Sequence, residues 1–320
     1  MSRIRVACVG VGNISPVHLD YLRSRSDVEI CALCDIRDEQ LRKRQAQYGG
    51  QIFSDYGELI KVAKPDALWL CTPPQVRRDP LLACAERGIP VFCEKPVERD
   101  PAKANRIARE LKRRKAKVQV GYVFRSMPTV LKLADEIKDD KIHLVQSLYG
   151  CGVSLSMNLP AWFYDKKLSG GALIDQATHN LDLLRRLLGE VSEVRGVASN
   201  PVHGKKKGYT IDETLSLGFV FKSGAVGGHV HTWVGDKWRN EVVLSGEKRL
   251  YRIDLGKGVL TVEEGGTTTT RTQNQAKMYE HENKVFLDMV RSGGWSRNPC
   301  EFEDAVKSLE LTLACDKAVS

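Results

Sequence analysis

Short apolar runs and helical stretches alternate regularly between residues 3 and 121. Stretches with helical patterning, such as 38–48, 79–87 and 101–114, separate runs that are predominantly apolar. These runs are IRVACVG, VEICALCD, ALWLCTPP, PVFCEKP and KVQVGY. A continuously apolar strand is buried on both faces, and a helix between successive strands makes the strands parallel. The pattern therefore predicts an α/β fold with a doubly wound parallel sheet, and we assign residues 1–124 to this domain.

The pattern changes near residue 125. A helix is expected over 129–138, a strand in IHLVQSLYG and a second helix over 171–188. The segments TLSLGFVF, AVGGHVHTWV, NEVVLSG, RLYRIDL and GVLTVEE then alternate apolar with polar residues, and a last helix is expected over 302–319. Closely spaced alternating strands with glycine-rich turns form an antiparallel meander. Residues 125–320 are thus predicted to form a second domain, in which GGTTTTRTQN is a polar loop.

Composition and charge narrow the class of protein. The 320 residues are enough for two domains. The net charge is +9, but Lys and Arg are interleaved with acids on predicted helix surfaces, which is more typical of solvated faces than of nucleic-acid binding. The excess positive charge can also attract an anionic coenzyme. Nine scattered cysteines suit a reducing compartment, and no apolar stretch is long enough to span a membrane, so we expect a soluble cytoplasmic protein.

A glycine-containing turn follows the first predicted strand. In VACVGVGNIS, Gly10 and Gly12 precede a helix that begins near Pro16. A turn without Cβ atoms brings backbone amides and a helix N-terminus against a pyrophosphate, although a purely structural turn is the alternative. The second strand ends in Asp35, whose carboxylate can bind an adenosine ribose. The negative charge of Asp35 would repel the 2′-phosphate of NADP, so Asp35 favours NAD. Arg37, two residues later, can partly reverse this preference.

Two further apolar strands end in candidate site residues. Ligands of open parallel sheets lie beyond the carboxyl ends of the strands. Thr72, Pro73 and Pro74 follow one strand and are predicted to line the coenzyme path, with a proline-stiffened turn as the alternative. Lys95 follows another strand in FCEKPV, where a nicotinamide ring would lie. A partly desolvated ammonium beside that cationic ring exchanges its proton more readily, whereas an ordinary surface lysine is the alternative.

The predicted helix over 171–188 carries a second candidate group. At about 100° per residue, Asp175, His179, Asp182 and Arg186 fall on one face, opposite a leucine-rich face. Asp175 and His179 are then neighbours, one turn apart. Two glycines before the helix allow a ligand to approach closely, and histidine moves protons near neutral pH. A charged outer face stabilised by i,i+4 pairing is the alternative.

Six motifs extend over nearly the whole chain. They are VGVGNISPVHLDYL, CDIRDE, CTPPQ, CEKPV, GYVFRSMP and GGALIDQATHNLDLLRRLLG. In this order they resemble the Gfo/Idh/MocA family, which includes glucose-fructose oxidoreductase and inositol 2-dehydrogenase. The resemblance implies a Rossmann domain joined to an α/β domain built on a large, mostly antiparallel sheet. The open face of that sheet often mediates oligomerisation in the family, so a homodimer or homotetramer is expected.

The resemblance also implies roles for individual residues. It makes Lys95, Asp175 and His179 the catalytic set, and it places Lys95 close to the coenzyme. It adds Asn13, Ile14, Glu94 and Arg125 to the coenzyme-binding positions Gly10, Gly12, Asp35, Arg37, Thr72, Pro73 and Pro74. Tyr122 joins Lys95, Asp175 and His179 as a substrate-binding position. The chain departs from the family at Ser15, in the glycine fingerprint, and at Arg77, where relatives usually have histidine.

The loop SLSMNLPAWFYDKKLSGG precedes the second candidate helix. Its aromatic residues Trp162, Phe163 and Tyr164 can stack on a sugar ring or anchor the loop, and we take Trp162 as a substrate-binding candidate.

Three histidines outside the catalytic set have open roles. His229 and His231 share one face of a predicted strand and can ligate a metal. Because Trp233 lies on the same face, a packed sheet or a subunit interface is favoured, and we predict no metal site. His18 matches a family histidine near the coenzyme loop, with packing of the first helix as the alternative.

The resulting functional prediction is an NAD(P)-dependent oxidoreductase acting on a secondary hydroxyl or ketone of a sugar, cyclitol or similar polyol. His179 is the general base, Lys95 hydrogen-bonds the reacting oxygen, and Asp175 orients its neighbours and binds a hydroxyl. A redox-assisted, NAD-dependent glycosidase with transient sugar oxidation is one alternative. A non-catalytic dinucleotide-binding sensor or repressor is the other.

Overall fold

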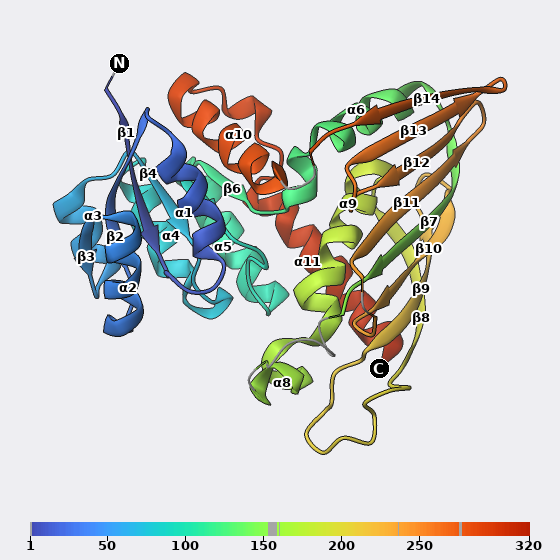
Figure 1. Ribbon diagram of the computed structural model, residues 1–320, viewed down its shortest axis with the longest axis horizontal. Helices are drawn as coiled ribbons and strands as arrows, with labels where there is room; N and C mark the ends of the chain where they lie inside the picture. Colours follow the sequence, from blue (N-terminus) through green and yellow to red (C-terminus); the bar gives the residue numbers. More distant parts are fainter. Residues whose placement is uncertain (1, 153–158, 160, 236, 275–276) are drawn as a thin grey trace. The chain divides into compact units, whose positions relative to one another are not determined.

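The chain folds into two compact units (Figure 1). The computed structural model describes residues 2–152, 159, 161–235, 237–274 and 277–320. Unit 1 comprises Met1–Val123 and Lys277–Leu309, and unit 2 comprises Phe124–Ala276 and Glu310–Ser320. Each unit therefore draws on two separate parts of the chain, and the residues after Lys277 contribute to both.

A six-stranded parallel sheet forms the centre of unit 1, in the order β3-β2-β1-β4-β5-β6. Its strands are β1 (Ile4–Val9), β2 (Val28–Cys34), β3 (Gln51–Phe53), β4 (Ala67–Leu70), β5 (Val91–Cys93) and β6 (Val118–Val120). Each of the five predicted apolar runs contains one of these strands, which confirms the doubly wound α/β fold. The sixth strand, β3, was not predicted; it is as short as β5 and β6, but none of its three residues is fully buried, so no apolar run marks it.

Helices cover this sheet in two layers. They are α1 (Ser15–Ser24), α2 (Asp38–Tyr48), α3 (Tyr56–Ala63), α4 (Arg78–Glu86), α5 (Pro101–Arg113) and α10 (Met278–Ser292), with the short η1 (Pro74–Val76) and η7 (Trp295–Arg297). Helix α1 contacts α2 and α10, whereas α4 contacts α3 and α5.

Helix α10 returns from the C-terminal part of the chain to complete the core of unit 1. Its Phe286 packs edge-on against Trp69 at 5.0 Å and Phe92 at 5.8 Å between ring centroids, and all three side chains are fully buried. Helix α10 was not predicted from the sequence, although seven of its fifteen residues are apolar. Its aromatic partners Trp69 and Phe92 lie far away in the sequence, so no local pattern shows that it belongs to unit 1.

An eight-stranded sheet forms unit 2, in the order β14-β13-β12-β11-β7-β10-β9-β8. Its strands are β7 (Ile142–Gly150), β8 (Val191–Ser199), β9 (Thr214–Phe221), β10 (Val226–Thr232), β11 (Arg239–Gly246), β12 (Leu250–Asp254), β13 (Val259–Glu264) and β14 (Thr267–Thr272). Strand β10 pairs with β7 in parallel, and the other described pairs are antiparallel. The mostly antiparallel sheet is confirmed, but β7 interrupts the expected meander.

The prediction of a polar loop in GGTTTTRTQN is wrong. This segment forms β14, which pairs with β13 from Val259 opposite Thr272 to Glu264 opposite Thr267. All six residues of β14 are exposed, so no apolar alternation marks the strand. Threonine nevertheless favours extended backbone, and an edge strand needs a partner on one side only.

Helices α6 (Pro128–Glu136) and α9 (Thr178–Leu188) lie over one face of the sheet of unit 2 (Figure 1). The other helical segments are η2 (Val123–Ser126), η3 (Ile137–Asp139), η4 (Ala161–Tyr164), α8 (Lys166–Ser169), the π-helical turn η5 (Leu173–Ala177) and α11 (Phe302–Val319). Helix α9 contacts β7, and α6 contacts β12 and β13. The first half of α11 belongs to unit 1 and the remainder to unit 2.

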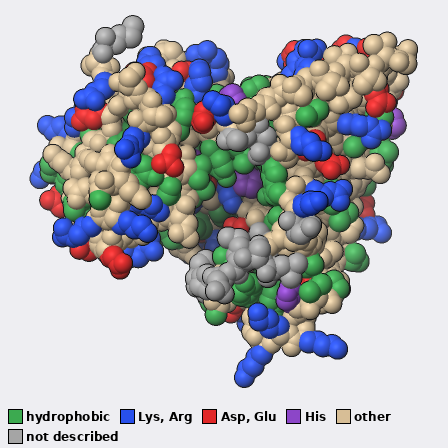
Figure 2. All heavy atoms as spheres, viewed as in Figure 1, with side chains coloured by type: hydrophobic (Ala, Val, Ile, Leu, Met, Phe, Trp, Pro, Cys, Tyr) green, Lys and Arg blue, Asp and Glu red, His purple; other side chains and the backbone are tan. Residues whose placement is uncertain are grey.

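None of the described helices combines the length and the apolar content needed to cross a membrane. Lys and Arg side chains are dispersed among acidic and neutral side chains over the visible face (Figure 2). This dispersion agrees with the interpretation of the +9 charge as solvated surface rather than a single basic patch.

Candidate active site

The two glycines after β1 have different physical roles. Gly10 has a φ of +85°, and a Cβ added there would lie 2.7 Å from the amide nitrogen of Thr72. Folding alone therefore requires glycine at position 10. A Cβ at Gly12 would meet only Nη2 of Arg37, at an ordinary 3.6 Å. The packing of the chain leaves space beside Gly12, as expected where a ligand approaches the backbone.

The N-terminus of α1 follows this turn without a side-chain cap. Ile14 occupies the N-cap position and its side chain accepts no hydrogen bond from the helix. Ser15 is fully buried, and its Oγ donates to the carbonyl of Gly12 at 3.0 Å, so this departure from the fingerprint fits the close helix packing. Uncapped amides at a helix N-terminus favour anions such as phosphate. Asn13 is exposed beside them.

Asp35 lies next to the turn, directly after β2. Its Oδ2 accepts a hydrogen bond from the amide of Val11 at 2.9 Å, and its Oδ1 accepts one from the amide of Arg37 at 3.0 Å. Burial alone would raise the pKa of Asp35, but these hydrogen bonds and the Arg37 guanidinium lower it below its ordinary value. An ionised carboxylate suits a ribose diol, and the exposed Arg37 lies within reach of the same position.

Thr72 opens the turn after β4, which continues through Pro73 and Pro74 into η1. The Thr72 hydroxyl is buried and has no hydrogen-bond partner among the described residues. A buried hydroxyl without a partner costs about 1–3 kcal/mol, so it fits a position where a polar ligand or water completes the bonding. The glycine turn, Asp35 and Thr72 together fit a dinucleotide coenzyme.

The loop after β5 carries Lys95 and is anchored by Glu94. Glu94 is 4% exposed, and its Oε2 accepts the amide of Lys95 at 3.0 Å. Its Oε1 accepts a hydrogen bond from Nε2 of His18 at 2.9 Å, and Nδ1 of His18 lies 3.1 Å from Oδ1 of Asn283. His18 therefore joins α1, the Lys95 loop and α10. The Lys95 side chain is half-buried.

A second carboxylate, Glu282, completes this buried cluster. Both of its oxygens lack a hydrogen-bond partner within the described part of the chain, as does Oε1 of Gln119. Burial lowers the pKa of His18, but the hydrogen bond and charge of Glu94 outweigh it, so the pKa is raised. Burial and the charge of Glu94 raise the pKa of Glu282 well above its ordinary value. This shift favours the neutral form of Glu282. No sequence pattern pointed to Glu282, Asn283 or Gln119.

The His18, Glu94 and Glu282 ligand atoms lie within 4.8 Å of one another, close enough for a metal ion. The imidazole, however, already uses Nε2 for Glu94 and Nδ1 for Asn283. Its raised pKa favours the protonated form, and a protonated imidazole has no lone pair for a metal. The cluster of His18, Glu94 and Glu282 therefore fits a proton shared among its side chains better than a metal cation.

In unit 2, Asp175 and His179 lie on different kinds of helix. Asp175 is in the π-helical turn η5, and His179 is in α9. A π-helical turn holds more residues than an α-helical one, so the count of about 100° per residue does not extend from Asp175 to His179. Both side chains are half-buried, and the His179 ring contacts Phe124 at 5.5 Å between centroids. Single π-helical turns are frequent at functional sites.

The alternative of a charged outer face on this helix does not hold at Asp182. Asp182 is 1% exposed and forms an ion pair with Arg125, with Oδ1 to Nη2 at 2.6 Å and Oδ2 to Nε at 2.7 Å. Arg186, predicted on the same face, is exposed. The guanidinium of Arg125, a predicted coenzyme contact, thus binds a carboxylate of its own unit.

The remaining substrate candidates have different environments. Tyr122 is 1% exposed in unit 1. The side chain of Trp162 lies outside the described residues, as do positions 153–158 and 160 of its loop. Phe163 stacks on Trp233 at 5.1 Å and Tyr164 on Tyr209 at 5.6 Å between centroids, which supports an anchoring role for these two aromatic residues.

His229 and His231 belong to the covered face of the sheet. Both side chains are fully buried, and Nδ1 of His229 lies 2.9 Å from Oγ of Ser147. Burial lowers the pKa of His229 to about 3 and that of His231 well below its ordinary value. The packed-sheet interpretation therefore holds, and the alternative of an exposed subunit interface at these residues is wrong.

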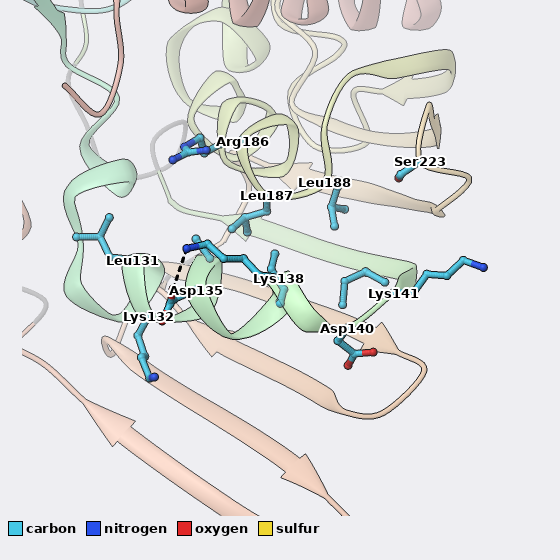
Figure 3. A pocket seen from close by; sticks show the side chains of 13 residues that line it. Leu131, Lys132, Asp135, Lys138, Asp140, Lys141, Arg186, Leu187, Leu188 and Ser223 are labelled. Carbon is cyan, nitrogen blue, oxygen red and sulfur yellow. Dashed lines mark hydrogen bonds and ion pairs between the residues drawn. The ribbon is translucent and has the colours of Figure 1, made fainter. Parts of the chain in front are cut away.

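A surface pocket of about 810 Å³ in unit 2 has none of the predicted site residues in its described lining. It lies between α6, η3, the start of β7 and the end of α9 (Figure 3). Among its cations, Lys138 is bound to Asp135 at 2.8 Å and Lys141 to Glu247 at 3.6 Å, whereas Arg186 is exposed.

Lys95 belongs to unit 1, whereas Asp175 and His179 belong to unit 2. In unit 1 the glycine turn, Asp35, Thr72 and the anchored Lys95 loop all follow carboxyl ends of parallel strands. That edge is where ligands of such sheets bind.

Comparisons with known proteins match both halves of the chain. A model described as an oxidoreductase family with an NAD-binding Rossmann fold matches residues 4–122, and a GFO/IDH/MocA C-terminal domain model matches residues 132–252. Myo-inositol 2-dehydrogenase of Thermotoga maritima is 25% identical over 99% of this chain and 96% of its own length. D-glucoside 3-dehydrogenase of Escherichia coli is 28% identical over 59% of this chain and 55% of its own.

A solved structure of levoglucosan dehydrogenase, in complex with NADH and levoglucosan, superimposes with a TM-score of 0.84. The two chains are 20% identical, and the superposition covers 99% of this chain and 97% of the other. This similarity shows the fold.

The raised pKa of Glu282 predicts a stability that depends on pH. Above its ordinary pKa the unfolded chain loses this proton while the folded chain keeps it, so folded stability falls as the pH rises. Glu282→Gln mimics the protonated carboxyl and removes this loss. We expect the variant to exceed the native protein in unfolding free energy by about 1 kcal/mol or more near pH 8, with the difference vanishing near pH 4.

Chemical denaturation at several pH values measures this difference. Glu280→Gln, on the same helix but in an ion pair with Lys277 that is partly exposed, is the matched control and should change stability by less than about 0.5 kcal/mol. A Glu282→Gln variant that is less stable than the native protein across the whole pH range would contradict a neutral Glu282.

Proposed function

The chain belongs to the Gfo/Idh/MocA family of NAD-dependent oxidoreductases, and from this premise we propose that it oxidises a secondary hydroxyl of a sugar or cyclitol, or reduces the corresponding ketone. Two relatives support this substrate class by their names, myo-inositol 2-dehydrogenase and D-glucoside 3-dehydrogenase. Its coenzyme is NAD(P).

The coenzyme binds unit 1 in this proposal. Gly12 and the uncapped start of α1 receive the pyrophosphate, Asp35 binds the ribose, and the Thr72 hydroxyl completes a contact along the path. When bound, the nicotinamide ring supplies the hydride acceptor or donor. Arg37 donates a hydrogen bond to Asp35 and is mostly exposed. Its positive charge can partly offset the repulsion between the Asp35 carboxylate and the 2′-phosphate of NADP.

Three side chains handle the substrate. The His179 imidazole takes the proton of the reacting hydroxyl, and the Lys95 ammonium donates a hydrogen bond to the same oxygen as it becomes a carbonyl. Asp175 accepts a hydrogen bond from a neighbouring substrate hydroxyl and orients the substrate. The proposal requires that Lys95 of unit 1 and His179 of unit 2 reach one bound substrate.

The observation that carries the proposal is the anchoring of Lys95. The residue follows the carboxyl end of β5, and its amide is held by a buried carboxylate that is itself bonded to His18. A surface lysine has no need of such an arrangement. A general acid or hydrogen-bond donor does, because a displacement of about 1 Å can lower a rate about 100-fold.

We extend the proposal to assembly and location. Val226 of β10 lies opposite Leu144 of β7 and Val220 of β9, and all three are exposed side chains on the face of the sheet away from the buried histidines. An exposed apolar strip of this kind suits a second copy of the chain, giving a homodimer or homotetramer. All nine cysteines are free thiols, which supports a cytoplasmic location.

Light scattering of the purified protein tests the assembly. We expect a mass of two or four chains in the native protein and a shift toward one chain in Val226→Lys, because a charge in an apolar interface is left unpaired. A native mass of one chain would contradict the proposed interface.

Turnover of a panel of polyols and sugars with NAD and NADP, followed by absorbance of the reduced coenzyme, tests the function. His179→Ala is expected to lower kcat by about 10²–10⁴-fold because it removes the general base. Lys95→Met is expected to abolish most turnover, and both variants should bind coenzyme with nearly native Kd. Lys103→Met, an exposed lysine on α5, is the control.

The same assay separates the alternatives. Cleavage of a glycoside without net coenzyme reduction would indicate the glycosidase, and coenzyme binding without turnover of any substrate would indicate the sensor. Near-native kcat in both Lys95→Met and His179→Ala would overturn the assigned roles.

Folding requires glycine at position 10 but not at position 12, so we expect Gly12→Ala to lose coenzyme affinity without losing stability. The chain has room for this Cβ, so the variant should fold with nearly native stability. The Kd for the coenzyme should rise about tenfold or more, because the backbone can no longer approach the pyrophosphate closely. Coenzyme titration by fluorescence measures the Kd. Gly218→Ala in β9 is the control, because its Cβ would meet its nearest neighbour, the carbonyl oxygen of Arg195, at 4.0 Å. A native Kd in Gly12→Ala would contradict coenzyme binding at this turn.

A further inference from the structure

Arg77 departs from the residue usual in the family, and its environment differs from that of a surface arginine. It follows η1 and precedes α4, yet its side chain is 3% exposed. A guanidinium is always charged, and burying it is costly unless its N–H groups are all used. Arg77 must therefore be held by specific partners.

Those partners are three backbone carbonyls from two different loops. Nε and Nη2 of Arg77 donate to the carbonyl of Thr72 at 2.9 and 2.6 Å. Nη1 donates to the carbonyls of Glu94 and Pro96. Thr72 belongs to the turn after β4, and Glu94 and Pro96 belong to the loop after β5. One side chain thus ties together the ends of two adjacent parallel strands.

Only arginine has the geometry for these contacts. The guanidinium presents five N–H donors in a rigid plane, so it can serve acceptors on two sides at once. Lysine carries a single charged nitrogen and histidine two ring nitrogens, and neither can reach both loops in the same way. Carbonyls beyond a strand end have lost their ladder partners, so without Arg77 they need water or remain unbonded.

The two carbonyls bound by Nη1 flank Lys95 directly in the sequence. The amide of Lys95 is bound in turn by the carboxylate of Glu94. The backbone of Lys95 is therefore held on both sides by Arg77 and at its own N–H by Glu94. On its other side, Arg77 binds the carbonyl of Thr72. The amide nitrogen of Thr72 is the atom that a Cβ added at Gly10 would meet at 2.7 Å, so this turn packs against the glycine turn.

We propose that Arg77 is a positioning residue for the reaction, which sets the distance between the turn that lines the coenzyme, Thr72–Pro74, and the loop that carries Lys95. This inference rests on the proposed oxidoreductase function. Arg77 touches neither substrate nor coenzyme in this proposal and acts through the backbone of Lys95. A merely structural arginine would affect stability but would leave the kinetics of the folded protein unchanged.

Kinetics of Arg77→Ala and Arg77→Lys test the proposal. We expect kcat to fall about 10- to 100-fold in both variants, with the coenzyme Kd changing less than about threefold. Lysine cannot replace the fork, so Arg77→Lys should recover little activity. Arg87→Lys is the matched control, because Arg87 also binds a backbone carbonyl, that of Ala83, but on the surface of α4.

Chemical rescue separates positioning from stability. Guanidinium chloride at tens of millimolar, well below denaturing levels, should enter the space left in Arg77→Ala and raise kcat about tenfold or more, since it restores the N–H donors to both loops. Sodium chloride at the same ionic strength should not, and neither salt should rescue Lys95→Met. Native kcat in folded Arg77→Ala, or equal effects of the two salts, would overturn the proposal.

Hydrogen exchange keeps the test independent of turnover. In Arg77→Lys, the amide of Lys95 should lose protection about tenfold or more, while core amides of β1 keep theirs. If the native protein turns over no substrate with either coenzyme, the proposed function fails, and this exchange experiment still decides whether Arg77 orders the Lys95 loop. Unchanged protection at Lys95 would overturn the inference. If Arg77→Ala does not fold, the exchange and kinetics of Arg77→Lys decide alone.

Discussion

A buried carboxylate that stays ionised needs hydrogen bonds to its oxygens, and at Glu94, whose pKa is lowered, this constraint organises the candidate site in unit 1. One oxygen binds His18 of α1 at 2.9 Å, and the other binds the amide of Lys95 at 3.0 Å. Removing a carboxylate from water costs several kcal/mol unless opposite charge and hydrogen bonds compensate. His18 is bonded in turn to Asn283 of α10. The position of Lys95 is therefore tied to two helices from opposite ends of the chain.

The carboxyl edge of the parallel sheet contains two kinds of polar group. Some are satisfied internally, such as the carbonyls of Thr72, Glu94 and Pro96, which Arg77 binds. The Thr72 hydroxyl is of the second kind, because it has no partner among the described residues, and Gly12 leaves steric room for a ligand beside its backbone. The first kind makes the loops rigid, and the second kind leaves bonding capacity for a ligand. A coenzyme site needs both, because rigid loops lower the entropy lost when the ligand binds.

Unit 2 contains a comparable arrangement of charge. Asp182 and Arg125 form a buried ion pair that fixes α9 against the start of unit 2, while Asp175 and His179 stay half-buried on the preceding turns. Breaking one partner of such a pair leaves an uncompensated buried charge. Asp175 and His179, which have proposed chemical roles, thus remain accessible, whereas Asp182 and Arg125 are held in a buried ion pair. This division agrees with a helix that positions a base rather than one that presents a charged face to solvent.

The amino-acid sequence by itself determined the doubly wound sheet, the glycine turn and the place of Lys95 after a buried strand, because periodicity and strand ends are local properties of neighbouring residues. It did not determine that His18 meets Asn283, 265 residues away, or that Glu282 joins their cluster, because no local pattern records such a contact. It did not show that Asp182 is buried, and its α-helical count does not extend across η5, where the chain takes a π-helical turn. It also misjudged β14, whose threonines show no alternation. Tertiary structure decided these points because burial, ion pairing and edge pairing depend on which distant segments pack together.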